Sequence, residues 1–556
     1  MKPSKIITCL VVTLTMVLLP ESLSAQSKGL KTISEKELRY HLEFIAGQEF
    51  RGRETTSSEL EIATLYLANW SKHEGLKPIL KDGSFYQSIP VSGTMVSEGK
   101  TKLKIVTKTE EIIYDYGKAF GGRFTTNGSF SGDIVFAGFG LRDSARGWND
   151  FKDINLSGKV VIILDGQIPQ NSPVNQMSAR LASRVSAIRN LGAAAVLVVL
   201  NPSRNAMVPA TFEIIPSGRM ATLYDSQRTR FEGTAASPAT ATIPSGTPQT
   251  RPTLPFAQAD ISHDVASKIL GVTGEEIAGM FNTILQGKQV SPKSVAGIRA
   301  QLDVSIEAYD TATRNVIAVI EGSDQVLKNE YVVLCAHHDH LGIVGGSVIA
   351  GADDNGTGTV ALMEIAQAFL TERPKRSVII AWFTGEERGL IGAHYFINNC
   401  PVPVEKISAC INLDMLGRNP TDSLFLVASD LLSSELDASI NKVNKQSGIN
   451  FGFDYKYSNL THPERVYFRS DHYPHLRFGI PSVWLFGGFT PDYHTPKDVL
   501  EYINYEKFLR TTKLAYLATF DIANKKELLK LDVNPAVTSR GIHNQQERSL
   551  FQAPAR

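Results

Sequence analysis

Between about residues 300 and 520, short runs of almost purely apolar residues alternate with segments of helical periodicity. Three of these runs, at 316–320, 331–335 and 377–383, lack the polar alternation of a strand that has one face in water. Such strands must be covered on both faces, as they are when helices pack on either side of a sheet. We therefore predict a three-layer α/β domain with a mixed sheet, of which residues 286–525 form the main part.

The pattern of helix-like and strand-like runs is different in the remaining residues. Residues 26–110 begin with two helix-like segments and are assigned to the N-terminal part of the same domain. Residues 111–285 contain short strand-like runs between turn residues but no dense set of catalytic residue types, which predicts an inserted, mostly β domain. Residues 526–556 are predicted to form a polar C-terminal tail.

The first 25 residues have the layout of a secretory signal peptide. A short basic start is followed by an apolar run from Ile6 to Pro20 and by small residues that end at Ala25. The run is too short for a comfortable membrane span, although an uncleaved anchor is the alternative. We expect cleavage near Ala25, export to the periplasm or the medium, and no stable membrane insertion of the mature protein.

Charge and cysteine content exclude some classes of protein. Lys plus Arg is 57 and Asp plus Glu is 56, a balance that argues against a dedicated nucleic-acid binder. Four cysteines are too few for a disulfide scaffold. Cys400 and Cys410 are candidates for a disulfide, although their spacing alone does not establish one.

Residue types that bind metals and move protons follow the predicted strands. Imidazole is the commonest metal ligand, and carboxylates can bind metals or orient imidazoles. Each cluster alone has a structural alternative, such as a helix cap or a solvated helix start. Because sites in open α/β sheets lie at the carboxyl ends of strands, the joint pattern predicts a metal-dependent active site. The clusters lie at 336–342, 351–358, 383–390, 412–415 and 493–498.

In this order, the five clusters resemble the di-zinc exopeptidase family (clan MH) that includes aminopeptidase Y, bacterial leucyl aminopeptidases and glutamate carboxypeptidases. The family patterns are His-x-Asp, Gly-Ala-x-Asp-Asp, Gly-Glu-Glu-x-Gly-Leu, Asp-Met and a late His-Thr. The resemblance covers roughly residues 330–500, and Gly52-Arg53-Glu54 is also similar to the family. Residues from about 130 to 275 resemble, more loosely, a protease-associated domain, through Gly158-Lys159-Val160-Val161 and the small-residue run at 192–196.

The resemblance implies two zinc ions per chain, for which cobalt or manganese would be possible substitutes. It implies that His337 and Asp414 complete one site, that Glu387 and His494 complete the other, and that Asp353 bridges both. The family has a cis peptide after the bridging aspartate, which would place it between Asp353 and the next residue.

Four further residues would serve the reaction without binding a metal. Glu386 would be the general base, which takes a proton from water and passes it to the leaving amine. Asp339 would orient the first histidine of its own motif. Tyr493 would donate a hydrogen bond to the oxyanion, and Asp498 would support the late histidine.

The resemblance implies hydrolysis at one end of a peptide. An aminopeptidase would hold the substrate ammonium with carboxylates, whereas a glutamate carboxypeptidase would hold a terminal carboxylate with Arg or Lys. Arg388, Arg418 and Arg469 lie near the motifs, but the sequence does not show where they point. We expect an aminopeptidase acting on peptides, with a glutamate-carboxypeptidase-like enzyme as the alternative.

Other classes fit the clusters less well. His337, Asp339 and His340 match part of the His-x-His-x-Asp-His motif of metallo-β-lactamase-like hydrolases, but the other four clusters have no role in that fold. We therefore expect His338 and His340 to be structural or supporting residues. Ser470-Asp471-His472 has no nucleophile elbow, so a pocket-lining role is expected. A non-enzymatic binding ectodomain or a single-zinc glutaminyl cyclase would be expected to lack ligands that are present here.

Overall fold

The computed structural model describes residues 27–541 except 118, 123, 125, 167, 170–171, 175, 202–219, 224–255, 345–346, 461 and 463. The predicted signal peptide lies outside the described residues, as does the end of the predicted C-terminal tail. Within the described part of the chain, no helix combines the length and the apolar character that crossing a membrane requires.

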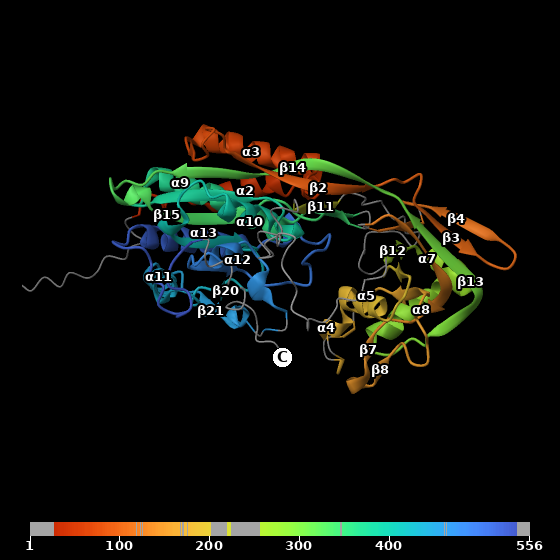
Figure 1. Cartoon of the computed structure of the whole chain (residues 1–556). Coiled ribbons are helices and arrows are strands. Elements are labelled where there is room, and N and C mark those ends of the chain that lie inside the picture. The colour runs from red at the N-terminus through yellow and green to blue at the C-terminus, as the bar shows by residue number, and fades with distance from the viewer. Residues whose placement is uncertain are drawn as a thin grey trace, which may run out of the picture.

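The described chain forms two bodies, each with its own sheet and hydrophobic core (Figure 1). The larger body contains a ten-stranded mixed sheet whose buried central strands pair in parallel. These strands are β18 (Ser377–Phe383), β15 (Tyr331–His337), β19 (Ile407–Asp414) and β22 (Ser482–Phe486). The outer strands are β14 (Ile306–Ile320), β2 (Tyr86–Val96), β11 (Met220–Leu223), β20 (Ser423–Val427) and β21 (Gly452–Asp454), and the short β1 (Lys77–Pro78) pairs with β14.

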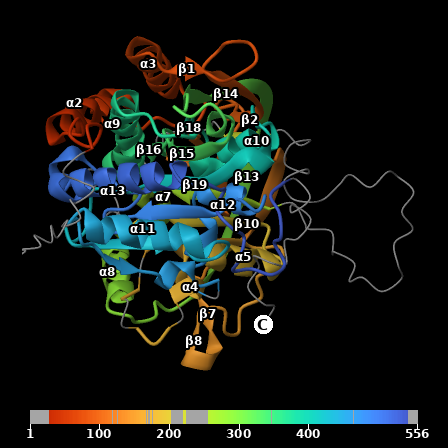
Figure 2. The ribbon, with the colours of Figure 1, turned by 90° about the vertical axis from the view of Figure 1, so that its left-hand side faces the viewer.

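Helices cover both faces of this sheet, which confirms the predicted three-layer architecture. Alternate residues of β15 enter different cores: Leu334 packs in the core shared with one set of helices, and Val333 packs with α10 on the opposite face. Figure 2 looks along the strands and shows the two helical layers on either side of them. One layer contains α2 (Glu35–Ile45), α3 (Ser58–Glu74), α9 (Gly358–Thr371), α11 (Ser434–Gln446) and α13 (Tyr505–Ala523), and the other contains α10 (Ile391–Asn398) and α12 (His472–Leu476).

The starts of several helices follow from local capping chemistry. The side chain of Ser34 accepts the N–H of Glu37 at the start of α2, and Ser57 does the same for α3. Helix α9 continues directly from the turn Ala352–Thr357, and the side chain of Asn355 in that turn accepts the N–H of Gly358 at 2.9 Å. The hydroxyl of Thr357 bonds instead within the turn, to the main-chain oxygen of Asp353 at 2.8 Å.

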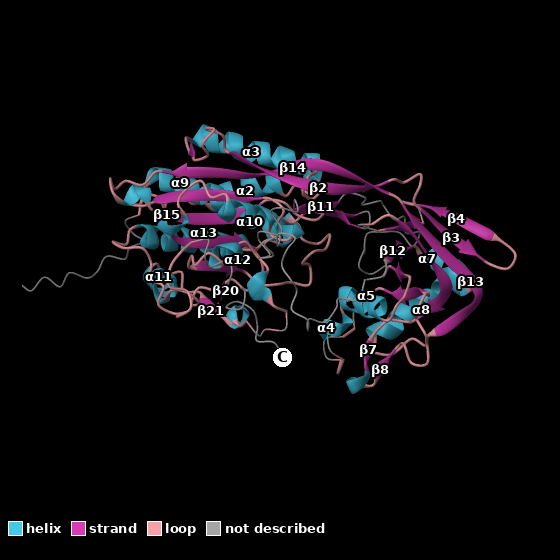
Figure 3. Ribbon diagram, viewed as in Figure 1, coloured by secondary structure: helices cyan, strands magenta, loops and turns pink. Residues whose placement is uncertain are grey.

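The smaller body contains an eight-stranded sheet in the order β4-β3-β13-β6-β9-β10-β12-β5, flanked by short helices (Figure 3). Its strands are β3 (Lys102–Val106), β4 (Glu111–Asp115), β5 (Phe120–Gly121), β6 (Gly128–Phe136), β9 (Val160–Leu164), β10 (Ala195–Val199), β12 (Ala257–Ile261) and β13 (Lys293–Val304). Its main helices are α5 (Leu181–Asn190), α7 (His263–Leu270) and α8 (Gly274–Leu285). The sheet begins before residue 111 and ends after residue 285, and the likeness to a protease-associated domain stays a prediction.

The two bodies are joined through β2 and β14, which pair in the larger sheet and lead toward the smaller one (Figure 1). Their pairing ends at Val96 and Ile306. Beyond that pair, the chain runs into β3 on one side and arrives from β13 on the other.

All three described cysteines are free thiols, so the candidate disulfide between Cys400 and Cys410 is not formed. The Sγ atom of Cys410 lies 3.6 Å from that of Cys335, on the neighbouring strand of the buried sheet. Cys400 lies instead in the loop after α10. The buried side chain of Cys410 thus contacts Cys335 rather than Cys400.

Candidate metal centre

Three neighbouring parallel strands end at the same edge of the larger sheet. His337 at the end of β15 pairs in register with Phe383 at the end of β18, and β19 ends at Asp414. The turn Ala352–Thr357 contacts β19 at this edge. The predicted clusters therefore converge because their strands run in the same direction and stop together.

The first group of potential metal donors is fully buried and consists of His337, Asp354 and Asp414. The Nε2 atom of His337 lies 3.3 Å from Oδ1 of Asp354 and 3.4 Å from Oδ1 of Asp414. One imidazole nitrogen and two carboxylate oxygens thus face a common point.

The second group consists of His340, Asp354, Glu387 and His494. The Nε2 atom of His494 lies 3.1 Å from Oδ2 of Asp354 and 3.3 Å from Oε1 of Glu387. The same Glu387 oxygen lies 2.7 Å from Nδ1 of His340. Asp354 belongs to both groups and presents Oδ1 to the first and Oδ2 to the second.

Asp354 is the residue that belongs to both donor groups, whereas Asp353, which was predicted to bridge them, belongs to neither. The Oδ1 atom of Asp353 instead accepts hydrogen bonds from the N–H of Gly417 at 2.6 Å and the hydroxyl of Thr357 at 3.2 Å. The cis peptide likewise lies one residue later than expected, between Asp354 and Asn355.

Gly351 sets the course of the turn that precedes these aspartates. Its φ angle is 62°, in the left-handed region that favours glycine. A Cβ atom at this position would lie 2.2 Å from the carbonyl oxygen of Asp354 and 2.5 Å from the ring of His340. A side chain at residue 351 would therefore displace two members of the second group.

Asp498 supports this turn rather than the late histidine, which corrects the predicted role. Its two carboxylate oxygens accept the main-chain N–H groups of Asp353 at 2.9 Å and Asp354 at 3.0 Å. Asp498 thereby orients the residue that belongs to both groups.

Asp339 contacts His337 mainly through its main chain. Nδ1 of His337 lies 3.1 Å from the Asp339 carbonyl oxygen and 3.7 Å from its carboxylate. The carboxylate accepts hydrogen bonds from the hydroxyl of Thr55 at 2.7 Å and from the N–H of Glu386 at 3.1 Å. The side chain predicted to orient the histidine therefore also positions the predicted base.

Two further contacts at the site had no specific signal in the sequence. Ser470 donates a hydrogen bond of 2.6 Å to Oδ2 of Asp414, which leaves Oδ1 of that aspartate directed at His337. The buried guanidinium of Arg53 donates to the carbonyl oxygens of Ile45, Ala350, Gly351 and His338, and so ties the N-terminal segment to both metal-facing loops. The similarity of Gly52-Arg53-Glu54 to the family was the only hint of this role.

The pKa values of the predicted base, Glu386, and of the shared carboxylate, Asp354, shift in opposite directions. Burial raises the pKa of Glu386 well above its usual value, and the carboxylates of Glu387 and Asp414 raise it further, against the opposing effect of His337. For Asp354, burial disfavours the charge, but the surrounding imidazoles hold its pKa well below the usual range. Without a cation, Glu386 thus favours its protonated form while Asp354 is an anion.

The donor set fits a divalent cation. Within the described part of the chain, several buried atoms that face the two groups have no hydrogen bond of acceptable geometry. They are His337 Nε2, both ring nitrogens of His340, Glu387 Oε1 and Asp414 Oδ1. Unpartnered buried polar atoms are costly, and a cation would satisfy them and offset the repulsion between the carboxylates. The mixture of imidazole nitrogen and carboxylate oxygen suits zinc.

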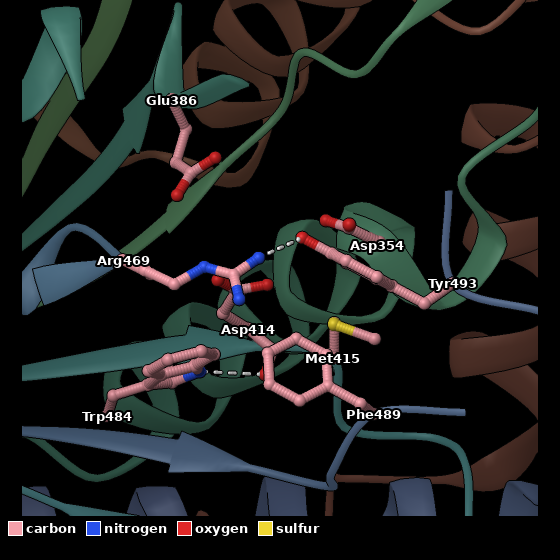
Figure 4. A pocket seen from close by; sticks show the side chains of 8 residues that line it. All are labelled: Asp354, Glu386, Asp414, Met415, Arg469, Trp484, Phe489 and Tyr493. Carbon is pink, nitrogen blue, oxygen red and sulfur yellow. Dashed lines mark hydrogen bonds between the residues drawn. The ribbon is translucent and has the colours of Figure 1, made fainter. Parts of the chain in front are cut away.

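A pocket opens beside the two groups and combines acidic, aromatic and basic walls (Figure 4). The ring of Tyr493 stacks on that of His494, with centroids 3.7 Å apart, and its hydroxyl accepts a hydrogen bond from Arg469. The residues that line the pocket are Asp354, Glu386, Asp414, Met415, Arg469, Trp484, Phe489 and Tyr493.

The geometry defines an α/β domain with adjoining metal-donor groups at the ends of its central strands, and the comparisons place this domain in a family. Residues 315–519 match the model of peptidase family M28. The chain thus carries a peptidase family M28 domain, which confirms the family resemblance seen in the sequence.

Curated relatives are aminopeptidases. Aminopeptidase YwaD of Bacillus subtilis (strain 168) is 26% identical over 234 residues, which cover 40% of this chain and 48% of the relative. Leucine aminopeptidase 2 of Trichophyton rubrum is 26% identical over 289 residues, which cover 45% of this chain and 54% of the relative. The chain spans about half the length of these relatives.

Two solved structures share the fold over most of the chain. BSAP, a zinc aminopeptidase from Bacillus subtilis, has a TM-score of 0.54 at 17% identity, covering 91% of this chain and 99% of that chain. An aminopeptidase from Aneurinibacillus sp. strain AM-1 has a TM-score of 0.50 at 19% identity, covering 92% of this chain and 98% of that chain. At these identities, the likeness concerns the fold alone.

Proposed function

We propose that the protein is an exported, zinc-dependent aminopeptidase that removes N-terminal residues from peptides with the help of two zinc ions. The observation that carries the proposal is the position of Asp354, whose two carboxylate oxygens face two adjoining groups of donors. The peptidase family M28 domain and the aminopeptidase relatives support the class of reaction. Export is supported by the layout of the first 25 residues.

One ion would be held by His337, Asp354 and Asp414, and the other by Asp354, Glu387 and His494, with His340 beside Glu387 as a further donor of the second group. Cobalt or manganese would suit the same donors. Zinc bound there would supply Lewis acidity, which lowers the pKa of water and polarises a carbonyl group.

The protein's own groups would move the proton and shape the pocket. Glu386 would take the proton from the attacking water and deliver it to the leaving amine. Because the hydroxyl of Tyr493 accepts its hydrogen bond from Arg469, its own proton is free to be donated to the developing oxyanion. The apolar side chains of Trp484 and Phe489 would exclude water from that side of the substrate.

A panel of substrates with and without a chelator tests the proposal. Chelator-sensitive release of an N-terminal residue from aminoacyl amides and unblocked peptides is the expected result. Cleavage restricted to N-blocked dipeptides would establish the glutamate-carboxypeptidase-like alternative, which the presence of Arg469 in the pocket favours. No chelator-sensitive hydrolysis of any peptide would instead support a binding ectodomain of the same fold.

Export has a separate test. The full chain would be expressed with its N-terminal segment in a Gram-negative host, and the N-terminus of the periplasmic or secreted product would be sequenced. We expect a mature chain that begins close to Gln26. A product retained in the membrane with Met1 still present would contradict cleavage.

A further inference from the structure

Of the three arginines near the motifs, two are held by carboxylates of the protein. Arg388 forms an ion pair with Glu54, and Arg418 forms one with Asp492. For Arg469, no carboxylate of the described residues lies within the ion-pair distance of 4.0 Å. Arg469 is also the arginine that lines the pocket.

The position of the Arg469 side chain is defined by aromatic neighbours. Its guanidinium carbon lies 5.0 Å from the ring centroid of Phe489 and 5.9 Å from that of Tyr493. Nη2 donates to the Tyr493 hydroxyl at 3.1 Å, the one hydrogen bond of this side chain among the described residues. Figure 4 shows the guanidinium joined by this hydrogen bond to Tyr493, with Glu386 above it in the view.

Arg469 is also linked through the main chain to a residue that contacts a metal donor. Arg469 directly precedes Ser470, whose hydroxyl is hydrogen-bonded to Asp414. A planar guanidinium with unused donors, fixed at the edge of a reaction site, matches the geometry of a carboxylate, which it binds through two parallel hydrogen bonds.

We propose that Arg469 determines specificity by binding a carboxylate of the substrate close to the scissile bond. Two sources have this chemistry: the terminal carboxylate of a dipeptide and an acidic side chain next to the bond that is cleaved. The inference rests on the proposed peptidase function, since it assigns the part of the substrate that the same pocket recognises. In either case, Arg469 contributes to binding, and the proton transfer remains with Glu386.

Two substrate pairs separate the sources of the carboxylate. Ala-Leu is compared with Ala-Leu amide, which differ at the terminal carboxylate, and Glu-Leu amide is compared with Gln-Leu amide, which differ at the side chain. In the zinc-loaded full chain, we expect the carboxylate of one pair to raise kcat/KM by roughly 10- to 100-fold, mainly through a lower KM. Arg469→Gln should abolish that preference, and Arg469→Lys should retain part of it.

Arg418→Gln is the matched control, because it removes a cation from the same region that is already paired with Asp492. It should keep the carboxylate preference of the unchanged protein. Absence of a preference in both pairs, or a preference that survives Arg469→Gln, overturns the assignment.

The same substrates distinguish a failure of the aminopeptidase proposal from a failure of the role of Arg469. If neutral amides are hydrolysed in a chelator-sensitive way but carboxylates have no effect, only the role of Arg469 falls. If no free-amine substrate is cleaved, the aminopeptidase proposal falls. Calorimetric binding of the same peptides to a zinc-loaded Glu386→Gln protein, with and without Arg469→Gln, then tests the carboxylate contact without turnover.

Discussion

The carboxylate of Asp498 accepts the main-chain N–H of Asp354 at 3.0 Å and so fixes the residue that belongs to both donor groups. Asp498→Asn would replace one of the two accepting oxygens by an amide that cannot accept. We expect the affinity for zinc to fall by roughly 10- to 100-fold, as for other residues that orient ligands. Competition with a chromophoric chelator measures this affinity.

Asp324→Asn is a suitable control for that measurement. Asp324 also accepts two main-chain N–H groups, from Val326 and Leu327, but in an exposed turn before the start of β15, whereas His337 lies at the end of that strand. Its zinc affinity should equal that of the unchanged protein. An Asp498→Asn protein with the same affinity as this control would refute the orienting role.

The two neighbouring aspartates should differ in their effect on metal content. Asp354→Ala should lose both ions, because the residue faces both groups. Asp353→Asn should retain them, because the oxygen that accepts from Gly417 is preserved. Elemental analysis after dialysis distinguishes the two variants, and the reverse result would restore Asp353 as the bridging residue.

Glu386→Gln should bind two zinc ions but lose activity. Because Glu386 lines the pocket without being a member of either donor group, its replacement by an isosteric amide removes proton transfer and leaves the donors in place. We expect kcat to fall by roughly 100- to 10,000-fold. A metal-replete variant with substantial turnover would exclude Glu386 as the base.

Stability should depend on pH through Glu364, a buried residue of α9. Burial raises the pKa of Glu364 to about 7, and its Oε1 atom has no hydrogen bond to any described residue. A folded-state pKa above the unfolded value means that stability is highest below about 4.5 and falls as the pH rises toward 7. Glu364→Gln should therefore be more stable than the unchanged protein by about 1–3 kcal/mol at alkaline pH, and equal to it in acid.

Thermal melting at several pH values measures how the stability difference between Glu364→Gln and the unchanged protein depends on pH. Glu372→Gln is the comparison, because the pKa of Glu372 is lowered instead of raised. Burial raises the pKa of Glu372, but hydrogen bonds from Gly29 and Ser27 outweigh it and lower the pKa overall. This variant should be destabilised at neutral pH, and the deficit should disappear as the pH falls. Parallel behaviour of both variants would show that burial of Glu364 does not control its protonation.

The sequence predicted the convergence of the site because it depends on strand direction. Runs such as 331–335 are apolar throughout, so their polar neighbours His337 and Asp339 had to lie at the strand end. It could not decide between Asp353 and Asp354, since they lie in a turn whose course depends on the left-handed Gly351. A turn has no fixed periodicity, and an error of one residue reverses the direction of a side chain.

The contacts of Arg53 and Asp498 that support the site could not be predicted from the sequence for a different reason. Arg53 contacts carbonyl groups almost three hundred residues away, and Asp498 contacts a turn about 145 residues before it. Neither contact leaves a local pattern in the chain. Similarly, the smaller sheet recruits β13 by pairing with β3, so its extent follows from long-range hydrogen bonds rather than from a change in composition.

The pairing of Val96 with Ile306 at the end of β2 and β14 has a consequence for how this architecture can vary. Paired residues on antiparallel strands lie only about 5 Å apart, a gap that a short turn can close. The whole smaller body is thus, topologically, the loop of a β-hairpin. Apart from the edge strand β11, it can be gained, lost or exchanged without breaking the strand order of the larger sheet.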